Sequence, residues 1–221
     1  MTGTPFPDRG FAAFLFDMDG TILTSIASAE RAWGDWARRH GLDVERFLPT
    51  IHGIQSVETI RRLNLPGVDP VAEAAAITLA EMDDMHDIAP IPGAVAFLSA
   101  LPRERWAVVT SAPRGLAERR LAASGIPAPS FLLAAEDSPR SKPEPDPFLL
   151  AAARLGVSAA DCLVFEDAPA GIAAAEAAGA AVTVITTTHR HPLATAHPTL
   201  DRYDGLRPVL GADGRLRIEA A

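Results

Sequence analysis

Asp17 and Asp19 stand two positions apart, directly after a short apolar run and just before Gly20 and Thr21. If that run is a strand of an open α/β sheet, its carboxyl end directs both carboxylates into the crevice where such sheets bind ligands. One carboxylate can then attack a phosphoryl group while the other protonates the leaving oxygen and later deprotonates water. Taken alone, the segment is also compatible with a simple Asp-rich turn.

Thr110 and Ser111 follow a second apolar run and precede a predicted helix, so their hydroxyl and backbone N–H groups are suited to binding a phosphate. Helix capping is the alternative role for this pair. Lys142 is the single lysine among the 20 Lys and Arg residues of the chain. Because a compact ammonium and a planar guanidinium are not interchangeable, we predict that Lys142 is a functional charge rather than a surface side chain.

Glu166 and Asp167 end a further apolar run. Two adjacent acids could simply favour the N-terminus of the helix that follows them. Together with Asp17, however, they provide the oxygen ligands that Mg²⁺ prefers, and such an ion often shares a substrate phosphate. We therefore predict a Mg²⁺ site formed by Asp17, Glu166 and Asp167, with Lys142 supplying further positive charge.

Unbroken apolar runs are typical of strands that are buried on both faces of a parallel sheet. The runs that predict strands are residues 11–16, 106–109, 131–134, 163–165 and 181–185. Helical spacing occurs between or beside them, at residues 93–101, 114–124, 146–155 and 169–178. Alternation of this kind predicts an α/β fold with a doubly wound, Rossmann-like parallel sheet. A small C-terminal hairpin is predicted around residues 211–214.

Residues 25–90 interrupt the alternation with helical patterns alone, at residues 28–40, 55–63 and 70–85. We predict an all-helical cap at residues 25–90, inserted into a catalytic core of residues 1–24 and 91–221. The cap is expected to close over the site and exclude water. Trp33 and Trp36, three positions apart, are predicted to pack in the core of the cap rather than to form a stacking platform.

The chain has 221 residues, of which 48% are hydrophobic, and a formal net charge of −8. This charge disfavours binding to nucleic acid or to anionic membranes. The first residues lack the pattern of a secretory signal, and the single cysteine, Cys162, cannot form an intrachain disulfide. We expect a cytoplasmic protein, a monomer or weak homodimer, whose partner is a small-molecule phosphate ester.

In this order, the four segments resemble the four motifs of the haloacid dehalogenase superfamily. The resemblance extends over nearly the whole chain and is closest to the helical-cap subgroup, which includes sugar and hexitol phosphatases, phosphoglycolate phosphatases and β-phosphoglucomutases. Within it, the segments at residues 30–33, 36–42 and 51–53 are most similar to bacterial sugar and hexitol phosphatases. The resemblance therefore implies a Mg²⁺-dependent phosphatase of small phosphorylated metabolites.

The resemblance also implies a role for each motif residue. Asp17 would be the nucleophile that forms an aspartyl-phosphate, and Asp19 the acid and base whose main-chain carbonyl also binds Mg²⁺. Thr110 and Lys142 would bind phosphate. Asp167 would ligate the metal ion, and Glu166 would do so directly or through water.

Two positions depart from the subgroup. Thr24 stands where an aspartate is usual near the cap hinge, and Ala29 stands where phosphomutases have a histidine. The second departure favours a phosphatase over a β-phosphoglucomutase-like phosphomutase. A phosphoglycolate phosphatase, a metal-free dehalogenase and a non-catalytic nucleotide-binding module are further alternatives, and the last lacks a Gly-x-Gly-x-x-Gly fingerprint.

Two groups of polar residues lie outside the motifs. His52 and Gln55 flank a glycine in the predicted cap and are candidates for selecting the leaving group, because both can hydrogen-bond sugar hydroxyls. Packing within the cap is the alternative role for His52. His189, His191 and His197 lie in a segment rich in Pro and Thr, which we interpret as a solvated loop rather than a transition-metal site.

Overall fold

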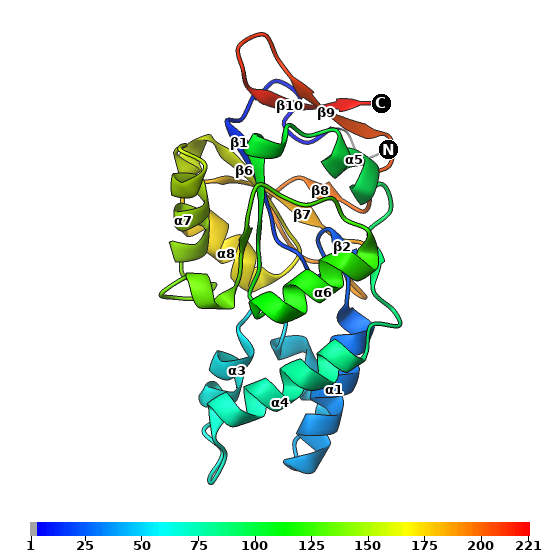
Figure 1. Ribbon diagram of the computed structural model, residues 1–221, viewed down its shortest axis with the longest axis vertical. Coiled ribbons are helices and arrows are strands. Elements are labelled where there is room, and N and C mark those ends of the chain that lie inside the picture. Colours follow the sequence, from blue (N-terminus) through cyan, green and yellow to red (C-terminus); the bar gives the residue numbers. More distant parts are fainter. Residues whose placement is uncertain (1–3) are drawn as a thin grey trace.

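The computed structural model describes residues 4–221 and consists of a sheet flanked by helices, with a separate body of helices at one end (Figure 1). Six strands form the sheet in the order β5-β4-β1-β6-β7-β8, and all neighbouring pairs are parallel. These strands are β1 (Ala13–Phe16), β4 (Trp106–Val109), β5 (Leu132–Leu133), β6 (Cys162–Glu166), β7 (Ala181–Ile185) and β8 (Thr199–Leu200). The predicted doubly wound parallel sheet is confirmed, whereas the short β8 was not foreseen.

Burial on both faces explains the apolar strands. In the central strand β1, Phe14 and Phe16 belong to a hydrophobic cluster on one face, while Ala13 and Leu15 belong to a cluster on the other. Side chains from α5 and α6 join the first cluster, and side chains from α7 and α8 join the second. These helices are α5 (Ala94–Ser99), α6 (Arg114–Ser124), α7 (Asp146–Arg154) and α8 (Pro169–Ala177).

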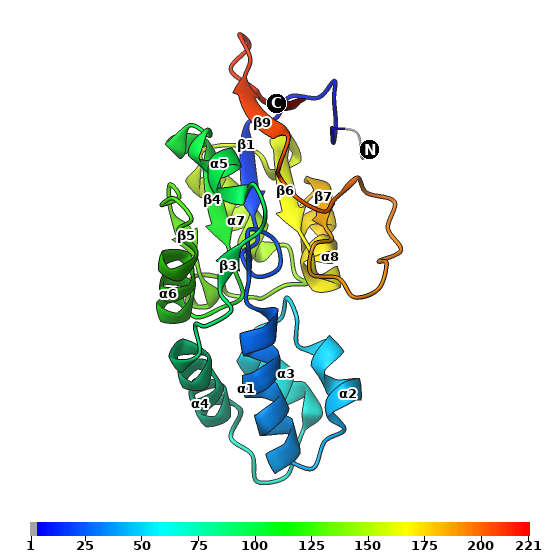
Figure 2. The same ribbon diagram turned by 90° about the vertical axis from the view of Figure 1, so that its right-hand side faces the viewer.

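The strand order changes direction at β1, which has β4 on one side and β6 on the other. Open α/β sheets bind ligands at the carboxyl ends of the strands beside such a point. Figure 2 shows that these ends face the helical body. The residues that follow β1, β4 and β6 therefore lie at the end of the sheet that faces these helices.

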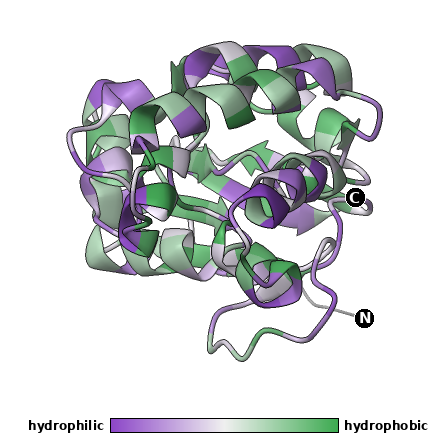
Figure 3. Cartoon of the chain, turned by 90° about the horizontal axis from the view of Figure 1, so that it is seen from below, coloured by the Kyte–Doolittle hydropathy of each residue, from purple (hydrophilic) through white to green (hydrophobic). Residues whose placement is uncertain are grey.

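The helical body has a hydrophobic core of its own. Its helices are α1 (Ile26–Arg39), α2 (Val44–Phe47), α3 (Ser56–Leu63) and α4 (Pro70–Asp83). Trp33, Trp36, Phe47, Ile60 and Ile77 belong to its buried cluster, which confirms that the two tryptophans are core residues. Seen from this end of the molecule, its helices combine hydrophobic and hydrophilic residues (Figure 3). Of these four helices, the sequence analysis predicts α1, α3 and α4 but not the four-residue helix α2.

Two connectors join the helical body to the sheet, and they pair with each other. The strands β2 (Leu23–Thr24) and β3 (Ala89–Pro90) form an antiparallel ribbon. Both lie where the sequence predicts the edges of the insertion. The pairing between them was not predicted, because it joins segments far apart in the chain.

The C-terminal hairpin covers the end of the sheet that lies opposite the helical body (Figure 1). It consists of the antiparallel strands β9 (Leu206–Leu210) and β10 (Leu216–Ala220), as predicted, and forms a sheet of its own. Four short 3₁₀ turns complete the described structure, at Leu48–Thr50, Arg103–Arg105, Ala135–Asp137 and Ala159–Asp161. Within residues 4–221, no helix has the length and apolar character needed to cross a bilayer.

Candidate active site

Several predicted site residues meet at the carboxyl ends of three neighbouring strands. Asp17 follows β1, Thr110 follows β4, and Glu166 ends β6 with Asp167 directly after it. The N–H of Asp17 donates to the Phe165 carbonyl oxygen at 2.9 Å, which continues the ladder between β1 and β6. All of these polar residues are buried. The sheet therefore positions them as the sequence predicts.

Lys142 is a buried ammonium and not a surface lysine, since its residue is only 1% exposed. Its Nζ donates to Asp17 Oδ1 and to Glu166 Oε1, both at 2.6 Å, and to the Val109 carbonyl oxygen at 3.1 Å. All three ammonium protons thus have acceptors. Burial opposes the charge, but the attraction of Asp17 and Glu166 outweighs it and raises the pKa of Lys142 above its usual value.

The acids around this lysine repel one another in a water-poor environment. Burial raises the pKa of Asp17 to about 8 despite the opposing charge of Lys142, and repulsion from Glu166 adds to the rise. Burial also raises the pKa of Asp167 well above its usual value, with repulsion from Glu166 and Asp17. Asp17 and Asp167 therefore tend to keep their protons at neutral pH.

These residues fit a divalent cation. Asp17, Glu166 and Asp167 each offer a ligand oxygen, and these atoms lie within 4.8 Å of one another. Lys142 is the one basic side chain of residues 4–221 that forms an ion pair with these acids, so the three carboxylates leave two negative charges uncompensated when all four groups are ionised. A hard cation with oxygen ligands would neutralise this excess. The cluster could therefore hold a metal ion.

Glu166 has partners for both of its carboxylate oxygens. Oε1 accepts from Lys142, and Oε2 accepts from the N–H groups of Asp167 and Ala168 at 2.8 and 2.9 Å. A Cβ atom on Gly171 would lie 1.5 Å from Glu166 Oε1, so only glycine allows α8 to approach this carboxylate. Glu166 is thus held in place by the backbone that leads into α8 as well as by Lys142.

Asp19 lies apart from the Lys142 network. Its Oδ1 accepts hydrogen bonds from Ser25 Oγ at 2.5 Å and from Arg120 Nη1 at 3.1 Å. Its side chain is 25% exposed, more than that of any acid in the metal-fitting cluster. Ser25 and Arg120 are site residues that the sequence reasoning missed.

Arg120 and Glu81 form a buried ion pair between the two parts of the molecule. Arg120 comes from α6, and its Nη2 lies 3.5 Å from Oε1 of Glu81 on α4. Burial raises the pKa of Glu81 to about 7, although the charge of Arg120 opposes the shift. The helical spacing could have shown that both charged residues are buried, because each lies on the apolar face of its helix. Arg120 shares that face with Leu116 and Ala117, and Glu81 lies four positions after Ile77.

Thr110 and Ser111 line the site in different ways. The Thr110 N–H donates to the Leu133 carbonyl oxygen at 2.9 Å, and its Oγ1 accepts from the Ala112 N–H at 3.1 Å. The Thr110 N–H is therefore part of the sheet rather than free for phosphate. Ser111 Oγ donates to the Gly53 carbonyl oxygen at 2.9 Å, so this hydroxyl joins the core to the helical body.

A cavity of about 70 Å³ lies between the sheet and the helical body. Asp17, Asp19 and Arg120 line it from the sheet side, and His52 and Trp33 from the helical side. Burial lowers the pKa of His52, so its imidazole favours the neutral form. The structure thus brings His52 to the same cavity as the predicted nucleophile.

Gln55 does not line this cavity. Its Nε2 donates to the Ala135 carbonyl oxygen at 2.9 Å, and it borders a neighbouring, mostly apolar cavity of about 400 Å³ between the same two parts. The predicted pair of leaving-group contacts is therefore separated: His52 faces the site, whereas Gln55 joins the helical body to the core.

The C-terminal histidines do not gather into a metal site within the described residues. His189 Nε2 lies 2.9 Å from the carbonyl oxygen of Asp167, and His197 Nε2 lies 2.8 Å from Glu176 Oε1. The preferred interpretation of this segment as a loop is consistent with its lack of regular structure from residue 186 to 198.

Comparison with known proteins identifies the family. A family model for haloacid dehalogenase-like hydrolases matches residues 11–179, which contain every motif residue described above. The chain belongs to this family. The protein is 42% identical over 176 residues to hexitol phosphatase A of Escherichia coli, a match that covers 78% of this chain and 82% of that relative. It is 36% identical over 176 residues to the fructose-1-phosphate phosphatase YqaB of Escherichia coli, covering 76% and 93% of the two chains.

Solved structures confirm the fold of this haloacid dehalogenase-like hydrolase. A variant of CbbY from Rhodobacter sphaeroides, in complex with xylulose-1,5-bisphosphate, superposes with a TM-score of 0.74 at 25% identity. The match covers 87% of this chain and 95% of that one. Together with the relatives named as phosphatases, the family assignment makes this protein a phosphoric monoester hydrolase.

Proposed function

We propose that this protein is a Mg²⁺-dependent phosphatase that hydrolyses sugar or sugar-alcohol phosphates through an aspartyl-phosphate on Asp17. The observation that carries this proposal is the placement of the Asp17 carboxylate. It lies 2.6 Å from a buried ammonium, belongs to the one acidic cluster of the described residues that fits a divalent cation, and lines the cavity under the helical body. The substrates named for the two relatives support the substrate class.

The reaction proceeds in two displacements. An oxygen of Asp17 attacks phosphorus and forms an O–P bond while the bond from phosphorus to the sugar oxygen breaks, and Asp19 gives a proton to that departing oxygen. Water then attacks the phosphorus of the aspartyl-phosphate, the O–P bond to Asp17 breaks, and Asp19 takes up a proton from the attacking water. Inorganic phosphate leaves and Asp17 is restored. Thr110, Ser111 and Lys142 bind the phosphoryl oxygens during both displacements.

Asp17, Asp167 and the main-chain carbonyl oxygen of Asp19 would hold the Mg²⁺ ion. Glu166 would act through a water molecule, since both of its oxygens already accept hydrogen bonds. When bound, the ion supplies positive charge between the attacking carboxylate and the phosphoryl group. Gly20 permits this arrangement, because a Cβ atom there would lie 2.0 Å from Asp167 Oδ2.

We assign residues 25–90 to a cap and residues 1–24 and 91–221 to the catalytic core. The paired connectors β2 and β3 support this division, since they are the two covalent links between the parts. Closure of the cap would exclude water from the phosphoryl group until the leaving group has departed.

Hydrolysis is preferred to phosphomutase activity. Ala29 lines the cavity, so α1 presents a methyl group where the resemblance places a histidine in mutases. A metal-free dehalogenase is also disfavoured, because it would leave Asp19, Glu166 and Asp167 without a role.

The test is release of inorganic phosphate from a panel that includes hexitol 6-phosphates, fructose 1-phosphate and glycerol 1-phosphate, with and without Mg²⁺. We expect turnover in Mg²⁺, its loss in EDTA, and no turnover by Asp17→Asn. Phosphate should appear in step with substrate loss. Full activity in EDTA, or isomerised sugar phosphate without free phosphate, would contradict the proposal.

His52 and Gln55 allow a test of leaving-group selection. His52→Ala is expected to lower kcat/KM for the best polyol phosphate by about tenfold more than for a small phosphate ester, because the small ester has no hydroxyls to bind. Gln55→Ala should affect both substrates alike, since Gln55 bonds to Ala135 outside this cavity. Equal losses for both substrates in His52→Ala would place leaving-group selection elsewhere.

A further inference from the structure

Arg120 is a buried cation of the site for which the proposed reaction has no use. Its side chain is 4% exposed and lies among apolar neighbours on α6. Nη1 donates to Asp19, but Nε and Nη2 form no hydrogen bond with any residue that the structure describes. Burying an ion pair is costly compared with apolar side chains of the same size, and donors without a hydrogen bond add to that cost. Stability alone therefore does not account for an arginine at this position.

The two hydrogen bonds that Asp19 accepts are both made to the same oxygen. Ser25, next to the ribbon, and Arg120, on α6, both donate to Oδ1. Two donors from different elements restrict the rotation of the carboxylate. Within residues 4–221, Oδ2 accepts no hydrogen bond, and Asp19 lines the cavity. Oδ2 is therefore the oxygen available for proton transfer.

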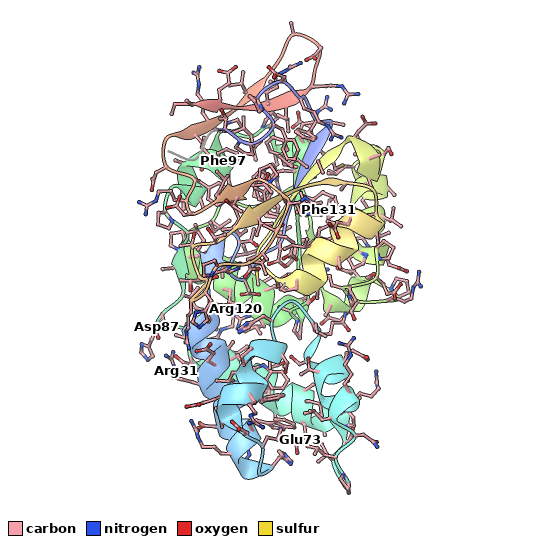
Figure 4. The ribbon with its side chains drawn as sticks, turned by 180° about the vertical axis from the view of Figure 1, so that it is seen from behind. Arg31, Glu73, Asp87, Phe97, Arg120 and Phe131 are labelled. Carbon is pink, nitrogen blue, oxygen red and sulfur yellow. The ribbon has the colours of Figure 1, made fainter. Side chains whose placement is uncertain are left out.

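The guanidinium is held between two acids that come from different parts of the molecule. Asp19 belongs to the core, and Glu81, 3.5 Å from Nη2, belongs to cap helix α4. Figure 4 shows Arg120 where the sheet domain meets the helical body. The position of the Arg120 guanidinium thus depends on the presence of the cap.

The geometry points to Arg120 as a positioning residue for acid catalysis. Building on the proposed phosphatase function, Arg120 holds Asp19 Oδ1 so that Oδ2 can give its proton to the leaving oxygen. It also stabilises the negative charge that Asp19 acquires when the P–O bond breaks and the proton moves. Glu81 keeps the guanidinium in place. Proton donation by Asp19 therefore depends on the docking of the cap against the core.

Substituted phenyl phosphates test this role, because they vary the need for a proton without adding hydroxyl groups. Nitrophenolate leaves readily without protonation, whereas phenolate benefits from an acid. We expect Arg120→Met to lower kcat/KM for phenyl phosphate by about 100-fold, the size of a general-acid contribution. The kcat/KM ratio of 4-nitrophenyl to phenyl phosphate should rise at least about tenfold. Since kcat/KM ends at loss of the leaving group, later hydrolysis on Asp17 does not affect the ratio.

Matched variants separate positioning from structure. Arg119→Met removes an exposed arginine from the adjacent position of α6 and should leave the ratio unchanged. Arg120→Lys keeps one charged donor and should restore part of the loss. If Arg120→Met fails to fold, Arg120→Lys replaces it in the test. We then expect the kcat/KM ratio of 4-nitrophenyl to phenyl phosphate to be a few fold higher than in the wild type.

Two results would overturn the inference. Equal losses for both phenyl esters in folded Arg120 variants would show a structural role. An unchanged ratio, with a raised KM for polyol phosphates alone, would make Arg120 a substrate contact. If the wild type releases no phosphate from any ester, the proposed phosphatase function is wrong. This result differs from a failure of the Arg120 inference, which concerns only differences between active proteins.

Discussion

At the scale of single residues, the site consists of buried charged groups that are stabilised mainly by one another. Lys142 neutralises part of the charge of Asp17 and Glu166, but burial, with added repulsion from Glu166, still raises the pKa of Asp17 to about 8. A carboxyl group with a raised pKa must release its proton when it binds a metal ion. The proposed binding of a metal ion at this site should therefore depend on pH.

The compact shape of Lys142 is the first feature to test. Lys142→Arg keeps the positive charge but replaces a single nitrogen, which donates to three acceptors, with a planar guanidinium. The lysine is only 1% exposed, so the larger group has little room. We expect kcat/KM for the best substrate to fall by at least about 100-fold. The reverse exchange at the exposed Arg140, Arg140→Lys, should leave it unchanged. Near-native turnover by a folded Lys142→Arg protein would contradict the assigned role.

Metal binding should release protons. Because the pKa of Asp17 is raised from 3.8 to about 8, this carboxyl is largely protonated at pH 7 and must ionise to ligate Mg²⁺. Apparent Mg²⁺ affinity should therefore rise from pH 6 towards pH 8. Titration calorimetry in buffers of different ionisation enthalpy should show release of about one proton or more at pH 6.5. Asp17→Asn should release about one proton fewer, and a pH-independent affinity would refute the expectation.

At the scale of elements, the contact between α4 and α6 is the least expected feature of the protein. Each helix places a charged residue on its buried stripe, and the two charges meet between cap and core. Arg120 is also bonded to Asp19. The docking of α4 against α6 is thereby physically connected to the placement of the Asp19 carboxylate.

Glu81 should make the stability of the protein depend on pH. Its pKa is raised from 4.5 to about 7 in the folded state, mainly by burial, so the folded state binds this proton more tightly than the unfolded state does. The contribution of Glu81 to stability is therefore greatest below pH 4.5 and falls as the pH rises towards 7. The shift corresponds to about 3 kcal/mol at about 1.4 kcal/mol per pKa unit.

The measurement compares Glu81→Gln with the wild type by denaturant unfolding. Glutamine cannot ionise, so the variant should gain stability relative to the wild type between pH 5 and pH 8, by up to about 3 kcal/mol. Taking the difference removes the titration of other groups. A difference in unfolding free energy that stays constant over this range would show that Glu81 is not protonated in the folded protein at pH 5.

At the scale of the whole molecule, the site and the C-terminal hairpin lie at opposite ends of the sheet (Figure 1). The hairpin is tied to the chain start by reciprocal hydrogen bonds between Phe11 and Leu216 at 2.8 and 2.7 Å. Both side chains belong to the main hydrophobic cluster. The hairpin therefore contributes to stability without contacting the site.

Leu216→Ala tests this separation. Leu216 is fully buried, so the substitution should reduce the free energy of unfolding by about 2–5 kcal/mol. Values of kcat and KM at a temperature where the variant is folded should not change. Leu210→Ala, in the same hairpin but 49% exposed, should lose less than about 1 kcal/mol. A large change in kcat for folded Leu216→Ala would indicate coupling along the sheet.

The sequence by itself determined the parallel sheet, the helical insertion and the meeting of Asp17, Lys142, Glu166 and Asp167. Most of this follows from local patterns: apolar runs specify strands buried on both faces, and polar residues after parallel strands share one edge of the sheet. Lys142 follows no strand, and its functional role is predicted because it is the single lysine of the chain. Only the tertiary structure decided which side chains meet across the cap and the core. It placed Arg120 against Asp19, 101 positions away in the chain, and turned Gln55 from the site towards Ala135. Such contacts depend on how two separately packed bodies dock, and no local period in the sequence encodes that docking.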